Sequence, residues 1–350
     1  MLVLLWGLEL DPPLAAVRKQ LADLRVLTEF VDQRQVLETE IRLDVAESVH
    51  ASLRVRDRDI DLDAATAAYV RPYDARELPA IANAGPQSSA WRHAMEVDDI
   101  LSSWSEMTPA FVVNRLGLTA SNSSKPYQLK QIRSLGFSVP ETLVTTDPIA
   151  AQAFWEHHGT VIYKSVSAIR SRVARLQPEH AQRLADISAC PTQFQQYIPG
   201  ADCRVHVVGD QLFATEVLCD ADDYRYPGQH PFEVRACRLP SDLADRCRRL
   251  AAAMQLPVAG IDLRRTSEGD WFCFEVNPSP GFTFYEAAAN QPIAKAIAEL
   301  LASGPAREDS QLLSGTHSSG GFDSPGRGTW GLSTGQLIRV DRAVTPLSPV

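Results

Sequence analysis

Two neighbouring segments late in the chain alternate apolar and polar residues, and a short turn sequence separates them. The first covers 260–264 and the second 271–277. Strict alternation is typical of strands with one buried face, and Glu268-Gly269 between the segments is typical of a two-residue hairpin turn. We therefore predict an antiparallel hairpin in which Ser267 faces Asp270. This hairpin constrains the fold strongly, because its register decides which polar side chains meet.

The predicted register places two acidic side chains opposite each other. Asp262 would face Glu275, and Gly260 would face Asn277. Like charges with Cβ atoms about 5 Å apart destabilise a sheet unless a cation lies between them. Two carboxylates and an amide oxygen suit Mg²⁺, with Mn²⁺ as the alternative, whereas a solvated face with acids placed by chance is the competing interpretation. The polar face would hold Asp262, Arg264, Cys273, Glu275 and Asn277, and the core face Ile261, Leu263, Phe272, Phe274 and Val276.

Composition limits the class of protein. The 350 residues are 45% apolar and 22% charged, which is enough for two or three domains with sizeable cores and excludes disorder throughout. With 34 Lys and Arg against 43 Asp and Glu, the formal net charge is −9. Non-specific binding to nucleic acid or an anionic membrane needs a basic surface, so neither is an expected partner.

The start of the chain and its cysteines favour a cytoplasmic protein. Residues 2–6 are apolar, but no Lys or Arg precedes them, and Asp11 follows too soon for a signal peptide or a spanning helix. We expect a buried strand there. The six cysteines include no CxxC pair and are too sparse for a disulfide scaffold, so reduced thiols are expected.

The pattern along the chain predicts an α/β protein with a C-terminal tail. A first unit ends near residue 114 and includes a hairpin over 49–63. A second unit alternates helices and strands from about residue 124 to 302. Eight of the 19 glycines fall in 303–350, interleaved with serines, and this composition predicts disorder.

Several short motifs follow one another in a recognisable order. They are Lys125 before a helix, Gly136-Phe137-Ser138-Val139-Pro140-Glu141-Thr142, Lys164 ending a strand, Gln195-Gln196-Tyr197-Ile198, Asp202-Cys203-Arg204, Gly260-Ile261-Asp262 and Glu275-Val276-Asn277. Over about 110–302 this series resembles the ATP-grasp superfamily, particularly its RimK-like branch and the MvdD-type ligases that modify ribosomally made peptides. The resemblance implies an ATP-grasp fold: a pre-ATP-grasp α/β domain over 1–114, a small lobe over 115–195, and a C-terminal lobe with the metal site over 196–302.

The resemblance also implies a role for each matched residue. Lys125 and Lys164 would neutralise nucleotide phosphates with flexible ammonium groups. Arg204 would stabilise the transferring phosphoryl group or an acyl phosphate, since a planar fork of donors suits developing charge. Asp262, Glu275 and Asn277 match the family's magnesium ligands. The remaining nucleotide-site residues are Asp202, which shares a strand face with Arg204, and the adenine-binding segment Gln195, Gln196, Tyr197 and Ile198.

Each of these residues also has an ordinary structural interpretation. A single lysine is more often a surface charge, 195–198 could be a buried strand, and Asp202 with Arg204 could be a surface salt bridge. His157-His158 lack a ligand partner at helical spacing, and His206 is more typical of a packed histidine than of a substrate-orienting one. We therefore leave these histidines as structural residues.

One loop departs from the family pattern. Many relatives have glycines after the second lysine, which let backbone amides approach phosphates, whereas this chain has no glycine over 165–172. Arg170 in this loop could face an acidic substrate. Arg225 lies in another expected loop and is a candidate for holding a substrate carboxylate.

These implications define an expected activity, that of an ATP-dependent carboxylate ligase. The substrate carboxylate would take a phosphoryl group from ATP, and an amine or hydroxyl would attack the resulting acyl phosphate. The N-terminal unit resembles that of the peptide-modifying branch and favours a peptide substrate. The alternatives are a RimK-like or dipeptide-type ligase of amino acids and, in another class, a nucleotide-binding regulatory protein without catalysis. A homo-oligomer is compatible with the sequence.

Overall fold

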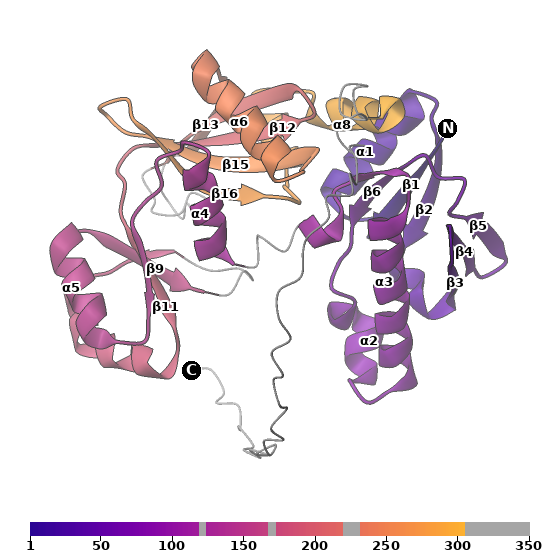
Figure 1. The fold of residues 1–350 in the computed structure, drawn as a ribbon, viewed down its shortest axis with the longest axis horizontal. Helices are drawn as coiled ribbons and strands as arrows, with labels where there is room; N and C mark the ends of the chain where they lie inside the picture. Colours follow the sequence, from indigo (N-terminus) through magenta and orange to yellow (C-terminus); the bar gives the residue numbers. More distant parts are fainter. Residues whose placement is uncertain (119–123, 167–172, 220–231, 305–350) are drawn as a thin grey trace, which may run out of the picture. The chain divides into compact units, whose positions relative to one another are not determined.

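The computed structural model describes residues 1–118, 124–166, 173–219 and 232–304. Within these residues the chain forms sheets of four, four, five and three strands together with helices, which confirms the predicted α/β class (Figure 1). No helix in the described part of the chain has the length and apolarity needed to cross a bilayer. The tail predicted to be disordered lies outside the described residues from 305 onward.

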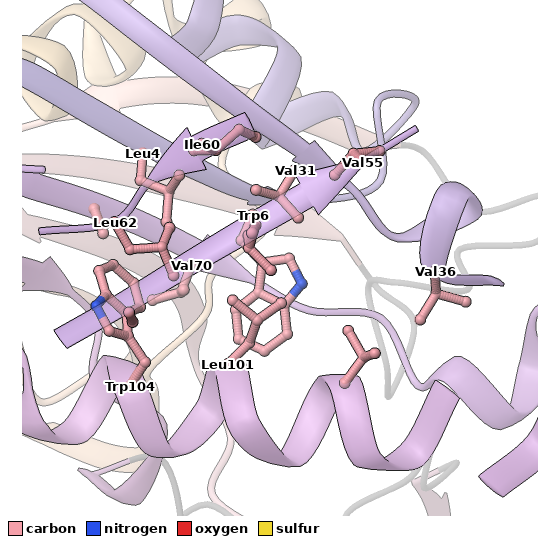
Figure 2. Packing of buried hydrophobic residues seen from close by; sticks show 14 of the residues in the cluster. Leu4, Trp6, Val31, Val36, Val55, Ile60, Leu62, Val70, Leu101 and Trp104 are labelled. Carbon is pink, nitrogen blue, oxygen red and sulfur yellow. The ribbon is translucent and has the colours of Figure 1, made fainter. Parts of the chain in front are cut away.

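A parallel sheet forms the N-terminal part, with strands in the order β2-β1-β6-β7. Helices α1 and α8 pack on the face that carries Val3 and Leu5, and α3 packs on the face of Leu4 and Trp6 (Figure 2). Burial on both faces explains the unbroken apolar run at the start of the chain. The elements are β1 (Leu2–Gly7), α1 (Pro12–Asp23), β2 (Leu27–Asp32), β6 (Ala67–Arg71), α2 (Pro79–Ala84), α3 (Ser89–Met107), β7 (Phe111–Val113) and α8 (Ile293–Ser303).

A small antiparallel sheet accompanies the parallel one. It consists of β3 (Thr39–Val45), β4 (Val49–Val55) and β5 (Arg58–Asp61), and the last two strands form the predicted hairpin. Leu53 and Ile60 pair across it and join the same core as Leu101 and Trp104 of α3. Short 3₁₀ segments occupy Gln33–Glu38 and Ala75–Glu77.

A second four-stranded sheet, with antiparallel pairing, follows in the middle of the chain. Its order is β10-β9-β11-β8, from β8 (Thr142–Thr145), β9 (Val161–Ser165), β10 (Ala174–Arg175) and β11 (Thr192–Gln196). Its core gathers Ala151, Val161 and Phe194 from α5 (Pro148–His158) and the strands, with Leu184 from the 3₁₀ segment Pro178–Ala189. Asp147 caps α5 through its side chain, as the Asp-Pro signal predicts.

The five-stranded antiparallel sheet carries most of the predicted site residues. Its order is β14-β13-β12-β15-β16. Helices α4 and α6 bury one face against Val205, Ile261 and Val276, and Tyr285 of α7 lies against the ring of His206 on the other. The elements are α4 (Lys125–Ser134), β12 (Ala201–Val208), β13 (Gln211–Cys219), β14 (Phe232–Cys237), α6 (Ser241–Ala253), β15 (Val258–Arg265), β16 (Trp271–Asn277) and α7 (Thr283–Ala289).

The hairpin of β15 and β16 differs from the prediction at its turn end. Arg265 pairs with Trp271 and the connection spans 266–270, so the predicted pairing of Ser267 with Asp270 is wrong. The register shifts by one residue beyond Asp262, which is a β-bulge on β16.

The bulge also corrects the predicted faces of β16. Cys273 pairs with Leu263 and is fully buried in the core, where a polar-face position was predicted. Phe272 pairs with Arg264, and the Phe274 ring lies 5.3 Å from the Arg264 guanidinium carbon, so both aromatics leave the predicted core face. One additional residue in a strand reverses the faces of everything on its far side.

Candidate functional site

Two acidic side chains stand opposite each other at the centre of the candidate site. Asp262 on β15 pairs directly with Glu275 on β16, and Gly260 pairs with Asn277, as the hairpin register predicted. The bulge lies on the turn side of these pairs and shifts the register by one residue, which brings Asp262 opposite Glu275 despite the longer turn. Carboxylate and amide oxygens together form a donor set suited to a hard divalent cation such as Mg²⁺.

Each carboxylate has a cationic partner from another element. Lys125, at the start of α4, places its Nζ 3.2 Å from Glu275 Oε2. Arg204 on β12 donates from Nη1 to Asp262 Oδ1 over 2.7 Å. These two ion pairs are mostly shielded from solvent, and their positive charges offset the repulsion between the opposed carboxylates.

Glycine at position 260 leaves the space that Arg204 occupies. A Cβ there would lie 2.3 Å from Arg204 Nη2 and 2.8 Å from the Cβ of Pro280, so any larger residue displaces the guanidinium or the loop. Opposite this position, Asn277 Oδ1 accepts a hydrogen bond from Ser279 N over 3.0 Å. An amide oxygen has a second lone pair, so this bond orients Asn277 and leaves it able to bind a metal.

Gln128, three residues after Lys125 on α4, is a residue that the sequence analysis missed. Its Nε2 donates to Val276 O over 2.7 Å, and its Oε1 accepts from Val276 N over 2.9 Å. Val276 lies between Glu275 and Asn277 on the edge strand, and Gln128 is buried. One side-chain amide therefore satisfies both backbone groups of this residue and ties α4 to the strand that carries two predicted metal ligands. The available signal in the sequence was a glutamine next to Leu129 and one helical turn before Ile132, two apolar residues that the helix buries.

A second pair of opposite charges crosses from β12 to β15. Asp202 pairs in register with Arg264, which donates from Nε and Nη2 to the two carboxylate oxygens over 2.8 and 2.9 Å. Arg264 also donates from Nη1 to the carbonyl of Ile198 over 2.9 Å. Asp202 shares a face with Arg204 as predicted, and Arg264 links it to the segment expected to bind adenine. Arg264 was predicted on the polar face of the hairpin, without a role in the site.

The segment 195–198 continues from β11 and is held by hydrogen bonds. The side-chain amide of Gln195 is buried and donates to Thr142 Oγ1 over 3.0 Å, so it serves the sheet. The Gln196 backbone N–H donates to Glu141 O over 2.9 Å, and the Tyr197 N–H to Thr160 O over 3.1 Å. These contacts occupy two of the backbone donors that could otherwise read an adenine edge.

Tyr197 lies between two arginines. Arg175 donates from Nη2 to the Tyr197 hydroxyl over 2.8 Å, and its guanidinium carbon is 4.2 Å from the ring centroid. The guanidinium carbon of Arg264 is 5.9 Å from the same ring. Cation–π contacts of this kind hold an aromatic ring in place and bring positive charge beside it.

Three other predicted site residues are not joined to this cluster by the contacts described above. Lys164 is buried on β9, in the second sheet, where it pairs in register with Gln193. Arg170 and Arg225 lie outside the described residues. Their predicted roles remain predictions.

His206 is a packed histidine in this structure. It is fully buried beside Tyr285, with ring centroids 5.2 Å apart. Burial, with a smaller effect of Arg204, lowers the pKa of His206 well below its ordinary value, so the imidazole is neutral near pH 7. A neutral imidazole adds no positive charge to the face that Arg204 occupies.

Comparison with known proteins identifies the family. The model of the RimK-like ATP-grasp domain matches residues 121–301, a range that contains the site from Lys125 to Asn277. The chain belongs to the RimK-like ATP-grasp family. The predicted resemblance to the RimK-like branch of the ATP-grasp superfamily is thereby confirmed.

Curated relatives match a part of this chain. The chain is 34% identical over 123 residues to a probable alpha-L-glutamate ligase of Photobacterium profundum, covering 34% of this chain and 40% of that protein. It is 30% identical over 132 residues to human beta-citrylglutamate synthase B, covering 34% of this chain and 33% of that protein. The matches thus span less than half the length of these relatives.

Solved structures are similar over most of the chain. The macrocyclase MdnC of Microcystis aeruginosa, bound with precursor peptide MdnA, is 22% identical with a TM-score of 0.75, over 87% of this chain and all of that one. The ATP-grasp ligase PsnB, complexed with minimal precursor, Mg and ADP, is 25% identical with a TM-score of 0.72, over 86% of this chain and 96% of that one. These similarities confirm the ATP-grasp fold and include the N-terminal sheet.

Proposed function

We propose that this chain is an ATP-dependent, ADP-forming ligase that activates a carboxylate of a peptide substrate and joins it to an amine or hydroxyl. The observation that carries the proposal is the cluster in which Lys125 and Arg204 bind the opposed carboxylates Glu275 and Asp262. Opposed acids with oxygen donors suit magnesium, and two cations beside them suit phosphate.

Each residue of this cluster has its own role in the proposed reaction. When bound, Mg-ATP supplies the phosphoryl group that turns a carboxylate into an acyl phosphate. Asp262, Glu275 and Asn277 would hold the metal through oxygen atoms. Lys125 would turn from Glu275 to phosphate, because its ammonium is a flexible point charge. Arg204 is held beside the metal site by Asp262 and would stabilise the charge that develops on the transferred group. Attack by the amine or hydroxyl then releases phosphate and forms an amide or ester.

A peptide substrate is supported by the extent of the structural similarity. MdnC and PsnB, each solved with a precursor peptide, match this chain over both its N-terminal sheet and its ATP-grasp part. The curated relatives favour a second candidate, a ligase of glutamate or another free amino acid, but their matches cover only about a third of this chain. A cytoplasmic location is part of the proposal and is supported by six cysteines that are all free thiols.

The test combines ADP release with mass analysis of the product. The double substitution Asp262→Asn with Glu275→Gln should abolish ATP turnover and leave the fold intact. Glu268→Gln with Asp270→Asn is the matched control, since it removes two carboxylates from the exposed turn of the same hairpin and should leave turnover unchanged. Full turnover in the first variant would refute the metal assignment.

Product mass decides between the substrate classes. Each internal link in a single peptide removes one water, a loss of about 18 Da, whereas ligation to a second molecule raises the mass. ADP release only with free amino acids would favour the glutamate-ligase alternative. ATP binding without ADP release in the presence of any carboxylate would favour a regulatory protein.

A further inference from the structure

Two histidines and a glutamate from different elements meet away from the ion pairs described above. His157 and His158 are in the last turn of α5, and Glu141 lies just before β8. One potential ligand atom of each residue lies within 4.8 Å of the other two. The sequence offered the two histidines no partner, and the fold supplies one.

The distances approach those of a tetrahedral metal site. His158 Nε2 lies 3.4 Å from Glu141 Oε2. Ligand bonds of 2.0–2.2 Å to Zn²⁺ at tetrahedral angles separate neighbouring ligand atoms by about 3.4 Å. His158 and Glu141 thus already have this spacing. The exposed side chains of Glu141 and His157 can rotate to bring in the third ligand.

Packing holds one histidine in place and leaves the site open to solvent. The His158 side chain is only 7% exposed, and its ring lies 4.3 Å from the Phe154 ring and 4.6 Å from that of His157. The Glu141 side chain is 63% exposed. A fixed ligand beside two accessible ones allows an ion to enter from water and leaves the fourth position to water.

We propose that Glu141, His157 and His158 form a second metal site, which takes a borderline divalent cation such as Zn²⁺. Two imidazoles and one carboxylate favour Zn²⁺ over the hard cation suited to the all-oxygen set of Asp262, Glu275 and Asn277. The second site does not depend on the proposed ligase activity.

A metal at this site would lie beside the backbone hydrogen bonds that link β8, α5 and the segment 196–197. The Glu141 carbonyl accepts from the Gln196 N–H over 2.9 Å, and the His158 carbonyl accepts from the Thr160 N–H over 2.7 Å. The Thr160 carbonyl in turn accepts a hydrogen bond from the Tyr197 N–H over 3.1 Å. A metal bound here would join the start of β8 to the end of α5, directly beside the backbone that holds 196–197. Zn²⁺ should therefore stabilise this sheet against unfolding.

Zn²⁺ titration of the full chain, freed of metal with a chelator, tests the proposal. Calorimetry should show stoichiometric binding and a rise in thermal midpoint. His157→Ala and Glu141→Gln should each weaken the affinity roughly tenfold or more, because each removes a direct ligand. Both side chains are exposed, so the variants should fold. His50→Ala is the control. His50 contacts Asp63 and Ser48, each over 2.8 Å, and Asp63 is its one acidic contact among the described residues, so its loss should leave Zn²⁺ binding unchanged.

The ligand type is a separate readout, since the chain also has thiols, including Cys203 and Cys237 with their sulfur atoms 3.7 Å apart. Co²⁺ in place of Zn²⁺ should give the visible bands of a nitrogen and oxygen site without a thiolate-to-metal charge-transfer band. A thiolate band, affinity unchanged in both His157→Ala and Glu141→Gln, or no binding of Zn²⁺ would overturn the proposal.

Discussion

Replacing Gln128 by Leu should weaken magnesium binding although Gln128 is not itself a predicted ligand. The substitution keeps the volume of a buried side chain and removes both hydrogen bonds to Val276, of 2.7 and 2.9 Å. A buried backbone group without a partner costs about 1–3 kcal/mol, so the two together cost roughly 2–6 kcal/mol of local stability. The lost stability is local to Val276, which lies between the predicted metal ligands Glu275 and Asn277.

Hydrogen exchange gives the direct measure of this local effect. The Val276 amide loses its acceptor, and a local loss of about 2 kcal/mol corresponds to exchange roughly 30-fold faster. Loss of a group that orients metal ligands typically lowers metal affinity by 10–100-fold, so the Mg²⁺ concentration at half-maximal ATP turnover should rise by about that factor. Excess Mg²⁺ should restore part of the rate.

The matched control lies on the same helix. Gln131→Leu makes the same chemical change but removes only an exposed hydrogen bond to Tyr127, 3.3 Å long. It should alter neither the exchange at Val276 nor the Mg²⁺ dependence. A folded Gln128→Leu protein with both quantities at their original values would show that the hydrogen bonds from Gln128 do not hold Val276 in place.

Other expectations test the site and the fold. Gly260→Ala should lower ATP turnover at least about tenfold while the protein stays folded. The alanine Cβ would lie 2.3 Å from Arg204 Nη2 and displace it, and a small displacement of a catalytic group lowers the rate strongly. Turnover at the original rate would contradict this. Burial raises the pKa of the Asp98 carboxyl from 3.8 to about 6, so this carboxyl binds its proton more tightly in the folded state than in the unfolded state. The stability that this proton adds to the folded state is therefore lost as the pH rises from about 4 to 6. Asp98→Asn should therefore raise the free energy of unfolding at pH 7 by roughly 1–3 kcal/mol in urea titrations and flatten its pH dependence; an unchanged pH profile would refute this. Chelation of Mg²⁺ should abolish turnover yet leave the circular dichroism spectrum unchanged, since Glu275 keeps Lys125 as its partner; unfolding on chelation would show that the metal holds the fold.

The central pairs of the site could be predicted from sequence because they depend on local rules. Alternation and a turn signal predicted which strands pair, and the predicted pairing of Asp262 with Glu275 is present because the bulge offsets the longer turn. The bulge at Phe274 could not be predicted, because one additional residue in a strand leaves no signature in composition. The longer turn and the bulge offset each other, so the prediction is wrong only between them, where Cys273 lies on the core face and Phe272 and Phe274 leave it.

The contacts that complete the site depend on tertiary structure. Lys125 reaches Glu275 across 150 positions of sequence, and Gln128 reaches Val276 across 148. No periodicity within α4 or β16 specifies that the two elements meet. The order of the family motifs could suggest that Lys125 belongs to the site. It could not reveal that the same helix also holds the backbone of β16, the strand that carries two of the predicted metal ligands.

The two ion pairs account for how one protein can hold this site both with and without its ligands. Without a metal, Glu275 and Asp262 are neutralised by Lys125 and Arg204, so the opposed acids do not force the strands apart. A bound divalent cation would take over the neutralisation of both carboxylates. The ammonium and guanidinium groups would then be available to phosphate and to the developing acyl phosphate without any change in the backbone. Under the proposed function, the same four side chains would serve folding and catalysis in turn, and the net charge of −9 gives no sign of this local balance.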